Sequence, residues 1–284
     1  MPAVVMDGKA LAARIRGEVA TEVAAFGRVE LATVLVGNDP ASHVYIDAKH
    51  KAAAEAGIHT RDLRLSAGTT QEEVLRRVRE LNDDPDVHGI LVQLPMPAHI
   101  DEEAVTRALL PVKDVDGLHP VNAGYLYLGT PLHIPATPGG CLALLDAYGV
   151  EIAGREAVVI GRSELVGRPA AMLLLTRHAT VIMCHSRTAD LAAHCRRADI
   201  VVAAVGIPRL VTEAMVKPGA AVLDVGLTRT EEGIVGDVDP AVAGVAGHLT
   251  PMPGGTGPMT IAMLLRSTVK AARFLNGDLA YPGR

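Results

Sequence analysis

Two residues of one predicted helix, Tyr45 and Lys49, have types and a spacing that suit catalysis. They lie four positions apart within residues 41–56, an alanine-rich stretch that ends before Gly57. Side chains at this spacing share one face of a helix. If that face lines a ligand site, desolvation lowers the pKa of the lysine and fits it for proton transfer or for polarising an electrophile. On an open surface the same pair has no chemical role, so the sequence leaves both interpretations open.

A second group of polar residues follows an apolar strand expected at 89–94. Gln93 lies at the carboxyl end of this strand, where open α/β sheets bind their ligands. An amide oxygen can hold an ammonium group without neutralising it, so Gln93 is a candidate partner for Lys49. The next turn carries Asp114 and Asp116, which either bind a ligand or only shape the turn. Further oxygen ligands do not cluster near them in the sequence, and we expect no metal site.

The junction at 157–169 is typical of a dinucleotide-binding site. An apolar strand is expected to end at Gly161 and a helix to begin near Gly167. The first glycine permits a tight turn, and backbone N–H groups at the helix start can bind phosphate. Ser163 replaces the middle glycine of the usual pattern, and Gly167 comes late in it. A plain connection between strand and helix therefore remains an alternative.

The residues around this turn indicate which nucleotide is bound. Folds that bind NAD usually place an acidic residue about 20 positions after the glycine turn. This chain has Ser186 and Arg187 after the next strand, and Arg162 in the turn itself. Guanidinium groups suit a 2′-phosphate, so we predict NADP over NAD, with ordinary surface arginines as the alternative. Gly226, at the end of a further strand, completes the expected cofactor side.

A glycine-rich loop at 251–258 precedes the last expected helix. Pro253, Gly254 and Gly255 allow the backbone to approach a ligand closely, and the helix start suits an anionic group. A tight turn without a ligand explains the same residues. The loop lacks the lysine-containing ending of an ATP-binding P-loop.

An α/β fold must position all of these residues. From 156 onward, short apolar strands alternate with helices, which implies right-handed crossovers and a parallel sheet. Between 110 and 138 the periodicity is lost and prolines and glycines accumulate, so we place the domain boundary there. We expect a first domain at 1–138, joined by a C-terminal helix at about 264–284, and a Rossmann-like parallel-sheet domain at 139–263.

The composition of the 284 residues limits the class of protein. Apolar residues make up 49% of the chain, enough for the cores of about two domains. A net charge of −5 and the absence of Trp argue against nucleic acid as a partner. The sequence shows neither a secretory signal nor a membrane-spanning apolar run. Cys141, Cys184 and Cys195 form no closely spaced pair, which fits reduced thiols in a cytoplasmic protein.

Six ordered blocks together resemble the bifunctional methylenetetrahydrofolate dehydrogenase/methenyltetrahydrofolate cyclohydrolase family over nearly the whole chain. The blocks occupy residues 45–51 with 57–58, 89–95, 111–117, 137–139, 161–167 and 253–260. The resemblance implies an N-terminal α/β folate-binding domain and a C-terminal Rossmann-like domain with a cleft between them. It also implies a cytoplasmic homodimer that acts on tetrahydrofolate derivatives in one-carbon metabolism and purine biosynthesis.

The reaction implied by the resemblance has two steps at one folate site. Hydride transfer to NADP oxidises 5,10-methylenetetrahydrofolate to the 5,10-methenyl cation, and hydrolysis then gives 10-formyltetrahydrofolate. By the family motif, Lys49 is the main catalytic group, Tyr45 stacks on and positions the folate, Gln93 binds the lysine and Asp116 anchors the pterin ring. The loop residues Pro253, Gly254 and Gly255 are expected to contact the substrate. The expected cofactor residues are Gly161, Arg162, Ser163, Ser186, Arg187 and Gly226.

Four positions depart from the usual family pattern. Ala136 stands where Cys is usual, Thr256 where Val is commoner, and Leu227 and Thr228 where Ile and Asn are typical. Thr256 and Thr228 border the expected cofactor region. We therefore expect any functional effect of these two departures to be on the affinity for the nucleotide or on the choice of nucleotide. Two other functions fit the general architecture: an NADP-dependent hydroxy-acid dehydrogenase similar to shikimate dehydrogenase, or a non-catalytic NADP-sensing module.

Overall fold

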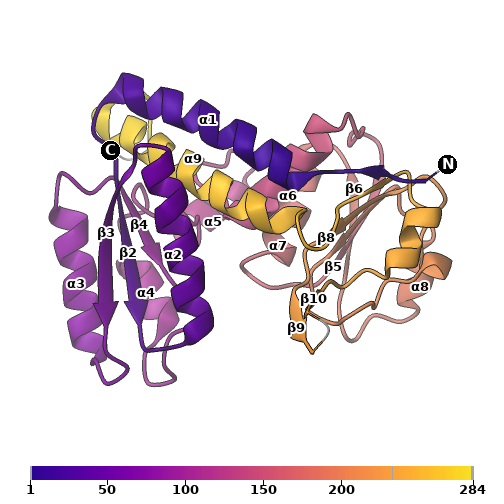
Figure 1. Ribbon diagram of the computed structural model, residues 1–284, viewed down its shortest axis with the longest axis horizontal. Coiled ribbons are helices and arrows are strands. Elements are labelled where there is room, and N and C mark those ends of the chain that lie inside the picture. Colours follow the sequence, from indigo (N-terminus) through magenta and orange to yellow (C-terminus); the bar gives the residue numbers. More distant parts are fainter. Residues whose placement is uncertain (1, 232, 283–284) are drawn as a thin grey trace. The chain divides into compact units, whose positions relative to one another are not determined.

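The computed structural model describes residues 2–231 and 233–282, which form two compact units (Figure 1). Unit 1 contains the described residues up to Ala13 together with Pro135–Thr260. Unit 2 contains Arg14–Ile134 and the described residues from Ile261 onward. The division falls inside two helices, α1 (Gly8–Phe26) and α9 (Thr256–Asn276).

The start of the chain adds a strand to the sheet of unit 1. The short strand β1 (Val4–Val5) pairs in parallel with β11 (His248–Leu249), and Met6 N donates to Leu249 O at 2.9 Å. A strand of two residues carries no readable periodicity, so only the tertiary pairing identifies it.

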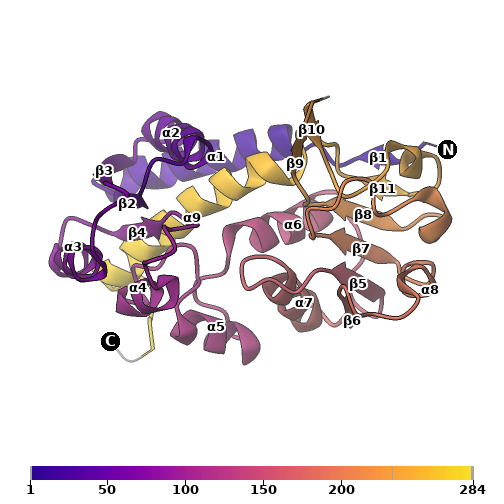
Figure 2. The ribbon, with the colours of Figure 1, turned by 90° about the horizontal axis from the view of Figure 1, so that it is seen from below.

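Unit 2 is built on a parallel sheet of three strands in the order β3-β2-β4. The strands are β2 (Glu30–Val36), β3 (His59–Leu65) and β4 (Gly89–Val92). The central strand β2 is buried along its whole length. Figure 2 shows α2 (Pro40–Glu55) on one side of this sheet and α3 (Gln71–Asp83) and α4 (Glu102–Ala108) on the other.

The side chains of β2 point alternately to the two faces of the sheet, which explains why helices pack on both faces. Ala32, Val34 and Val36 lie in one apolar core with Val74 and Val78 of α3, since every second side chain of a strand faces the same way. Asp39 before Pro40, and Thr70 three residues before Glu73, are sequence signals that predict helix starts, and both starts are capped. Asp39 caps α2 by accepting from Ser42 N at 2.8 Å, and Thr70 caps α3 by accepting from Glu73 N at 3.3 Å.

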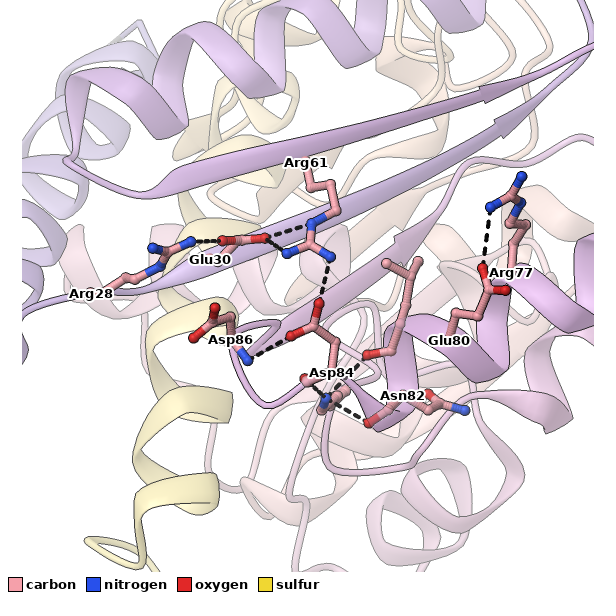
Figure 3. A network of polar contacts seen from close by, with 10 residues as sticks. Arg28, Glu30, Arg61, Arg77, Glu80, Asn82, Asp84 and Asp86 are labelled. Atoms are coloured by element: carbon pink, nitrogen blue, oxygen red, sulfur yellow. Dashed lines mark hydrogen bonds and ion pairs between the residues drawn. The ribbon is translucent and has the colours of Figure 1, made fainter.

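A charged network covers the amino-terminal ends of β2 and β3 (Figure 3). The buried carboxylate of Glu30 accepts from Arg28 Nη2 at 2.6 Å and from Arg61 Nε at 2.8 Å. Arg61 also donates to Asp84 Oδ2 at 2.6 Å, just after α3. A buried carboxylate needs such partners, because desolvation of an unpaired charge costs several kcal/mol. The network therefore connects the edge strand β3 to the central strand and to α3.

Unit 1 is built on a parallel sheet of six strands in the order β1-β11-β8-β7-β5-β6. Besides β1 and β11, its strands are β5 (Glu156–Ile160), β6 (Thr180–Cys184), β7 (Ile200–Ala203) and β8 (Ala221–Asp224). The helices α6 (Ala136–Ala147) and α7 (Gly167–Thr176) pack together, and α7 packs on β5 and β6. The other elements are α8 (Leu191–Cys195), η1 (Glu213–Met215), η2 (Pro240–Gly244) and a hairpin of β9 (Thr228–Thr230) and β10 (Gly233–Val235).

The stretch at 110–138 is more regular than its composition indicates. It contains α5 (Pro120–Tyr127), and α6 begins at Ala136. Proline is compatible with the first turn of a helix, and Pro120 occupies that position in α5. Similarly, α9 begins at Thr256, so Pro258 lies within its first turn rather than at its start. None of the helices in the described part of the chain has the length and apolar content needed to cross a membrane.

His133 makes the stability of unit 2 depend on pH. Its ring is buried, packs edge-on against Phe274 with centroids 5.5 Å apart, and shares a hydrogen bond of 2.9 Å between Nε2 and Val112 O. Burial lowers the pKa of His133 to about 4. Between the unfolded pKa of about 6.5 and this folded value, the unfolded chain binds a proton that the folded chain does not. The free energy of unfolding therefore falls as the pH falls through this range.

We predict that replacing His133 by Phe weakens this pH dependence. From pH 7 to pH 5, His133 accounts for a loss of about 2 kcal/mol in the free energy of unfolding, which the variant lacks. At pH 7 the variant is less stable by about 1 kcal/mol, because it loses the hydrogen bond to Val112 O. Urea unfolding followed by far-UV circular dichroism at both pH values measures the difference. The same pH-dependent loss in both proteins would contradict the prediction.

Candidate functional site

The side chains of Lys49 and Gln93 meet in unit 2, as the sequence predicts. Lys49 Nζ donates to Gln93 Oε1 at 3.0 Å. The other end of the amide is fixed, since Gln93 Nε2 donates to Leu94 O at 2.7 Å, and Gln93 N donates to Val34 O at 2.9 Å. The amide oxygen is therefore held towards the lysine. Tyr45 precedes Lys49 on α2 by four positions, with 40% of its surface exposed.

The electrostatic surroundings of Lys49 favour loss of its proton. Burial lowers the pKa of Lys49, and the negative charge of Asp116 offsets part of that effect. Burial likewise raises the pKa of Asp116, and the charge of Lys49 offsets part of it. The lysine and the carboxyl group therefore each favour the charged form of the other. Since Gln93 contributes no charge, the lysine has a hydrogen-bond acceptor without a full counter-charge beside it.

Asp116 is positioned by the turn that precedes it. Lys113 Nζ is buried and donates to three carbonyl oxygens at the end of α3, those of Leu81, Asn82 and Asp84, at 3.1, 2.7 and 2.7 Å. A cation suits this place because the carboxyl end of a helix carries partial negative charge. Ile90 N of β4 donates to Lys113 O at 2.7 Å, which fixes the turn beside the strand that leads to Gln93.

The carboxylate of Asp114 stabilises the same turn through hydrogen bonds within the protein. It accepts from His119 N at 2.7 Å and from Asn122 Nδ2 at 2.9 Å. Burial raises the pKa of Asp114 to about 6, against the opposing effect of these hydrogen bonds. Of the two carboxylates in this turn, Asp114 is therefore structural and Asp116 interacts with the lysine.

In unit 1, the predicted cofactor residues follow the carboxyl ends of three strands of the sheet, β5, β6 and β8. Gly161 directly follows β5, Ser186 and Arg187 follow β6, and Gly226 follows β8. Because all strands of this sheet are parallel, these ends lie at one edge. That edge is where open α/β sheets bind their ligands.

The glycine turn after β5 can exist only with small residues. Gly161 has φ +119°, and a Cβ atom there would lie 2.3 Å from Ala204 O. A Cβ atom at Gly167 would lie 2.2 Å from Gly161 O. Ser163 Oγ accepts from Val166 N at 3.2 Å and from Gly167 N at 3.3 Å, so it caps the start of α7. The serine in the place of the middle glycine therefore has a defined structural task.

The turn after β6 presents an exposed hydroxyl and guanidinium group. Ser186 and Arg187 are exposed, and so is Arg162 in the glycine turn. His185 Nδ1 accepts from Arg187 N at 3.1 Å, and Thr188 Oγ1 accepts from His185 N at 2.8 Å. These bonds shape the turn while its two outward side chains remain open to a ligand.

The loop with Pro253, Gly254 and Gly255 belongs to unit 1, whereas Tyr45, Lys49, Gln93 and Asp116 belong to unit 2. Gly254 has φ +112°, and its carbonyl accepts from Lys9 N at 3.1 Å. A Cβ atom at Gly8 would lie 1.7 Å from Gly255 O. The start of α1 is therefore in direct contact with the loop backbone and restricts its conformation.

The two threonines that depart from the family pattern make internal hydrogen bonds. Thr256 is buried, and its hydroxyl donates to Asp224 O at 2.9 Å, which connects the start of α9 to the end of β8. Thr228 Oγ1 donates to Gly206 O at 3.2 Å. Ala136 is buried at the start of α6. The hydroxyl of Thr256 therefore acts within the fold of unit 1.

The local sequence pattern does not single out the loop after β7, residues 204–206, as part of the cofactor side. In the sheet, β7 lies between β5 and β8, so this loop ends at the same edge as Gly161 and Gly226. The apolar run that ends before Gly206 does indicate a strand in the sequence. In a parallel sheet, the loop that follows such a strand lies at the edge where ligands bind. The strand order, which a single sequence does not reveal, makes the loop a candidate cofactor contact.

Comparison with known proteins assigns the family. Residues 6–116 match the tetrahydrofolate dehydrogenase/cyclohydrolase catalytic domain, and residues 135–276 match the NAD(P)-binding domain of the same family. The bifunctional protein FolD of Moorella thermoacetica is 54% identical over 280 residues, which cover 96% of this chain and 100% of that protein. The chain therefore belongs to the tetrahydrofolate dehydrogenase/cyclohydrolase family.

Solved structures agree with this assignment. The bifunctional FolD enzyme, methylenetetrahydrofolate dehydrogenase/cyclohydrolase, of Campylobacter jejuni is 45% identical, with a TM-score of 0.94 over 98% of this chain and 100% of that one. The corresponding enzyme of Trypanosoma brucei, solved with NADP and an inhibitor, is 40% identical, with a TM-score of 0.92 over 99% of this chain and 100% of that one. The family and its two domain types are thus confirmed.

We predict that Gly161→Ala destabilises the protein more than Gly149→Ala, a matched control. Both glycines have positive φ, +119° and +67°, but a Cβ atom at Gly149 would meet nothing within 4 Å. Backbone strain should therefore lower the free energy of unfolding of the control by only about 1 kcal/mol. Gly161→Ala adds a clash with Ala204 O and should lower it by about 3 kcal/mol or more. Urea unfolding measures both losses, and equal values would show that the turn does not pack as described.

Proposed function

We propose that this protein is a bifunctional enzyme that oxidises 5,10-methylenetetrahydrofolate with NADP and hydrolyses the resulting 5,10-methenyl cation to 10-formyltetrahydrofolate. Family membership supports both activities. The observation that carries the proposal in this chain is the hydrogen bond of 3.0 Å from Lys49 Nζ to Gln93 Oε1 in the catalytic domain.

In the oxidation step, the protein mainly positions the substrate. NADP, when bound, accepts the hydride from the methylene carbon, so no side chain needs to supply redox chemistry. We propose that Tyr45 stacks on the folate and that Asp116 anchors the pterin ring. Gln93 holds Lys49, whose depressed pKa limits electrostatic repulsion of the cation that the hydride leaves behind.

In the hydrolysis step, Lys49 becomes the main catalytic group. A lysine held by its hydrogen bond can direct a water molecule to the amidinium carbon, and in its neutral form the amine accepts the proton that the water releases. The amide of Gln93 fixes the direction of the ammonium or amine without adding charge. Pro253, Gly254 and Gly255 of unit 1 are proposed to contact the substrate, since glycines permit close approach of the backbone.

The cofactor residues lie at the carboxyl edge of the unit 1 sheet. We propose that the backbone around Gly161 and Ser163 receives the pyrophosphate at the start of α7. Arg162, Ser186 and Arg187 are proposed to bind the 2′-phosphate, which supports NADP over NAD. Gly226 is proposed to border the nicotinamide side, where a side chain would prevent close approach.

We further propose that the enzyme is a cytoplasmic homodimer with a role in purine biosynthesis. The three cysteines are free and buried, which supports a reducing compartment. The dimer follows from the family resemblance, and the product, a formyl donor, supports the metabolic role. The functional domains are proposed as a folate-binding domain at 1–138 with the last helix, about 264–284, and an NADP-binding domain at 139–263.

A spectrophotometric assay with 5,10-methylenetetrahydrofolate and NADP tests the proposed function. We expect NADPH to form with little accumulation of the methenyl intermediate, and slower turnover when NAD replaces NADP. Equal efficiency with both nucleotides would remove the proposed role of Arg162 and Arg187. If neither NADPH nor the methenyl intermediate forms while NADP binds, the folate assignment is contradicted. That result would favour a hydroxy-acid dehydrogenase or an NADP-sensing module, neither of which the family comparison supports.

We predict that Lys49→Met reduces hydrolysis by about 100-fold or more, because the water loses its positioned base. Oxidation should fall by no more than hydrolysis, since hydride transfer needs positioning rather than a proton acceptor. Lys51→Met is the matched control, because Lys51 is exposed on the same helix and should retain both activities. Full hydrolysis by Lys49→Met would reject the assigned role of the lysine.

A further inference from the structure

Two buried carboxyl groups of unit 1 have no part in the mechanism above. Asp224 ends β8, Asp237 follows the β9-β10 hairpin, and their exposed fractions are 2% and 0%. The two oxygens of Asp224 accept from Asp237 N at 2.8 Å and from Val238 N at 3.2 Å. The carboxyl group of Asp224 therefore fixes the backbone that carries Asp237.

The carboxyl group of Asp237 in turn binds the loop after β7. Its Oδ2 atom accepts from Val205 N at 2.6 Å and from Gly206 N at 3.1 Å. Among the described residues, its buried Oδ1 atom has no hydrogen-bond partner. Two consecutive amides that converge on one charged oxygen hold a loop more firmly than a neutral acceptor would.

Neighbouring glycines show how closely both carboxyl groups are packed. A Cβ atom at Gly226 would lie 1.9 Å from Cγ of Asp237. A Cβ atom at Gly236 would lie 1.8 Å from Oδ2 of Asp224. Each carboxyl group thus occupies the space that a Cβ atom at the nearby glycine would fill. Neither carboxyl group can move closer to the backbone of that glycine.

The loop held by Asp237 borders the proposed cofactor residues on both sides. Ala204 O contacts Gly161, where a Cβ atom would lie only 2.3 Å away. On the other side, Val225 N and Gly226 N both donate to Ala203 O, at 2.9 and 3.2 Å. A displacement of the loop would therefore alter the backbone on both sides of the nucleotide edge.

We propose that Asp237 is a positioning residue for NADP: by binding Val205 N and Gly206 N, it sets the loop after β7 in the conformation that accepts the cofactor, while Asp224 orients Asp237. This inference rests on the proposed NADP-dependent oxidation. A merely structural carboxyl group would instead support the fold of the whole protein and affect both activities alike.

The hydrolysis step separates these two roles, because 5,10-methenyltetrahydrofolate can be supplied directly without NADP. For Asp237→Ala, we expect the KM for NADP to rise by about tenfold or more, as two amides lose their acceptor. Hydrolysis without NADP and the KM for 5,10-methylenetetrahydrofolate should stay within about twofold of the wild type. Asp237→Asn keeps one oxygen, though a neutral one, for the two amides and should restore part of the affinity for NADP.

A second pair of variants tests whether Asp224 orients Asp237, without changing either carboxyl group. Gly236→Ala forces Asp224 away from the backbone before Asp237 and should also raise the KM for NADP. Gly244→Ala is its control, because a Cβ atom there meets nothing within 4 Å in the same unit. We expect Gly244→Ala to behave as the wild type in both activities.

The outcomes are distinct. A selective rise in the KM for NADP in Asp237→Ala, with recovery in Asp237→Asn, supports the proposal. An unchanged KM, or a parallel loss of oxidation and NADP-independent hydrolysis, overturns it. Failure of the proposed function itself would be visible separately, as a wild-type protein that lacks the two activities.

Discussion

The contact between Lys49 and Gln93 is the interaction on which the proposed chemistry depends. It places a partly buried ammonium group against a neutral amide, 3.0 Å from its oxygen, with the charge of Asp116 acting on it as well. A carboxylate in the place of Gln93 would stabilise the charged form of the lysine. An apolar residue there would remove the hydrogen bond that orients the lysine side chain. The amide orients the group while desolvation lowers its pKa, which suits a lysine that must act beside a cationic intermediate.

Much of the remaining structure of unit 2 maintains that contact. The capped start of α2 fixes the helix that carries Lys49, and the pairing of β4 with β2 fixes the strand that leads to Gln93. Lys113 binds the end of α3 and so holds the turn with Asp116. In unit 1 the backbone itself forms the proposed cofactor edge of the sheet, with glycines packed against carbonyl oxygens and carboxyl groups at distances that exclude any side chain.

The sequence predicts the parts of this arrangement that depend on local pattern. The helical spacing of Tyr45 and Lys49, the caps of α2 and α3, and the strands around the glycine turn are local features, and the structure contains them. It does not predict β1, because two residues have no periodicity, or α5, because prolines and glycines conceal a short helix. Nor does it predict the contacts of Asp237 with Val205 and Gly206, since strand order and pairing between distant segments arise only from tertiary packing.

The most direct test of the account is the titration of the Lys49 side chain by heteronuclear NMR, with its resonance assigned by its absence in Lys49→Met. The account predicts a pKa for Lys49 below the ordinary lysine value of about 10.4, because burial outweighs the charge of Asp116. A pKa at or above that ordinary value would contradict it, since Lys49 would then be a fully charged group that repels the intermediate it is proposed to hydrolyse.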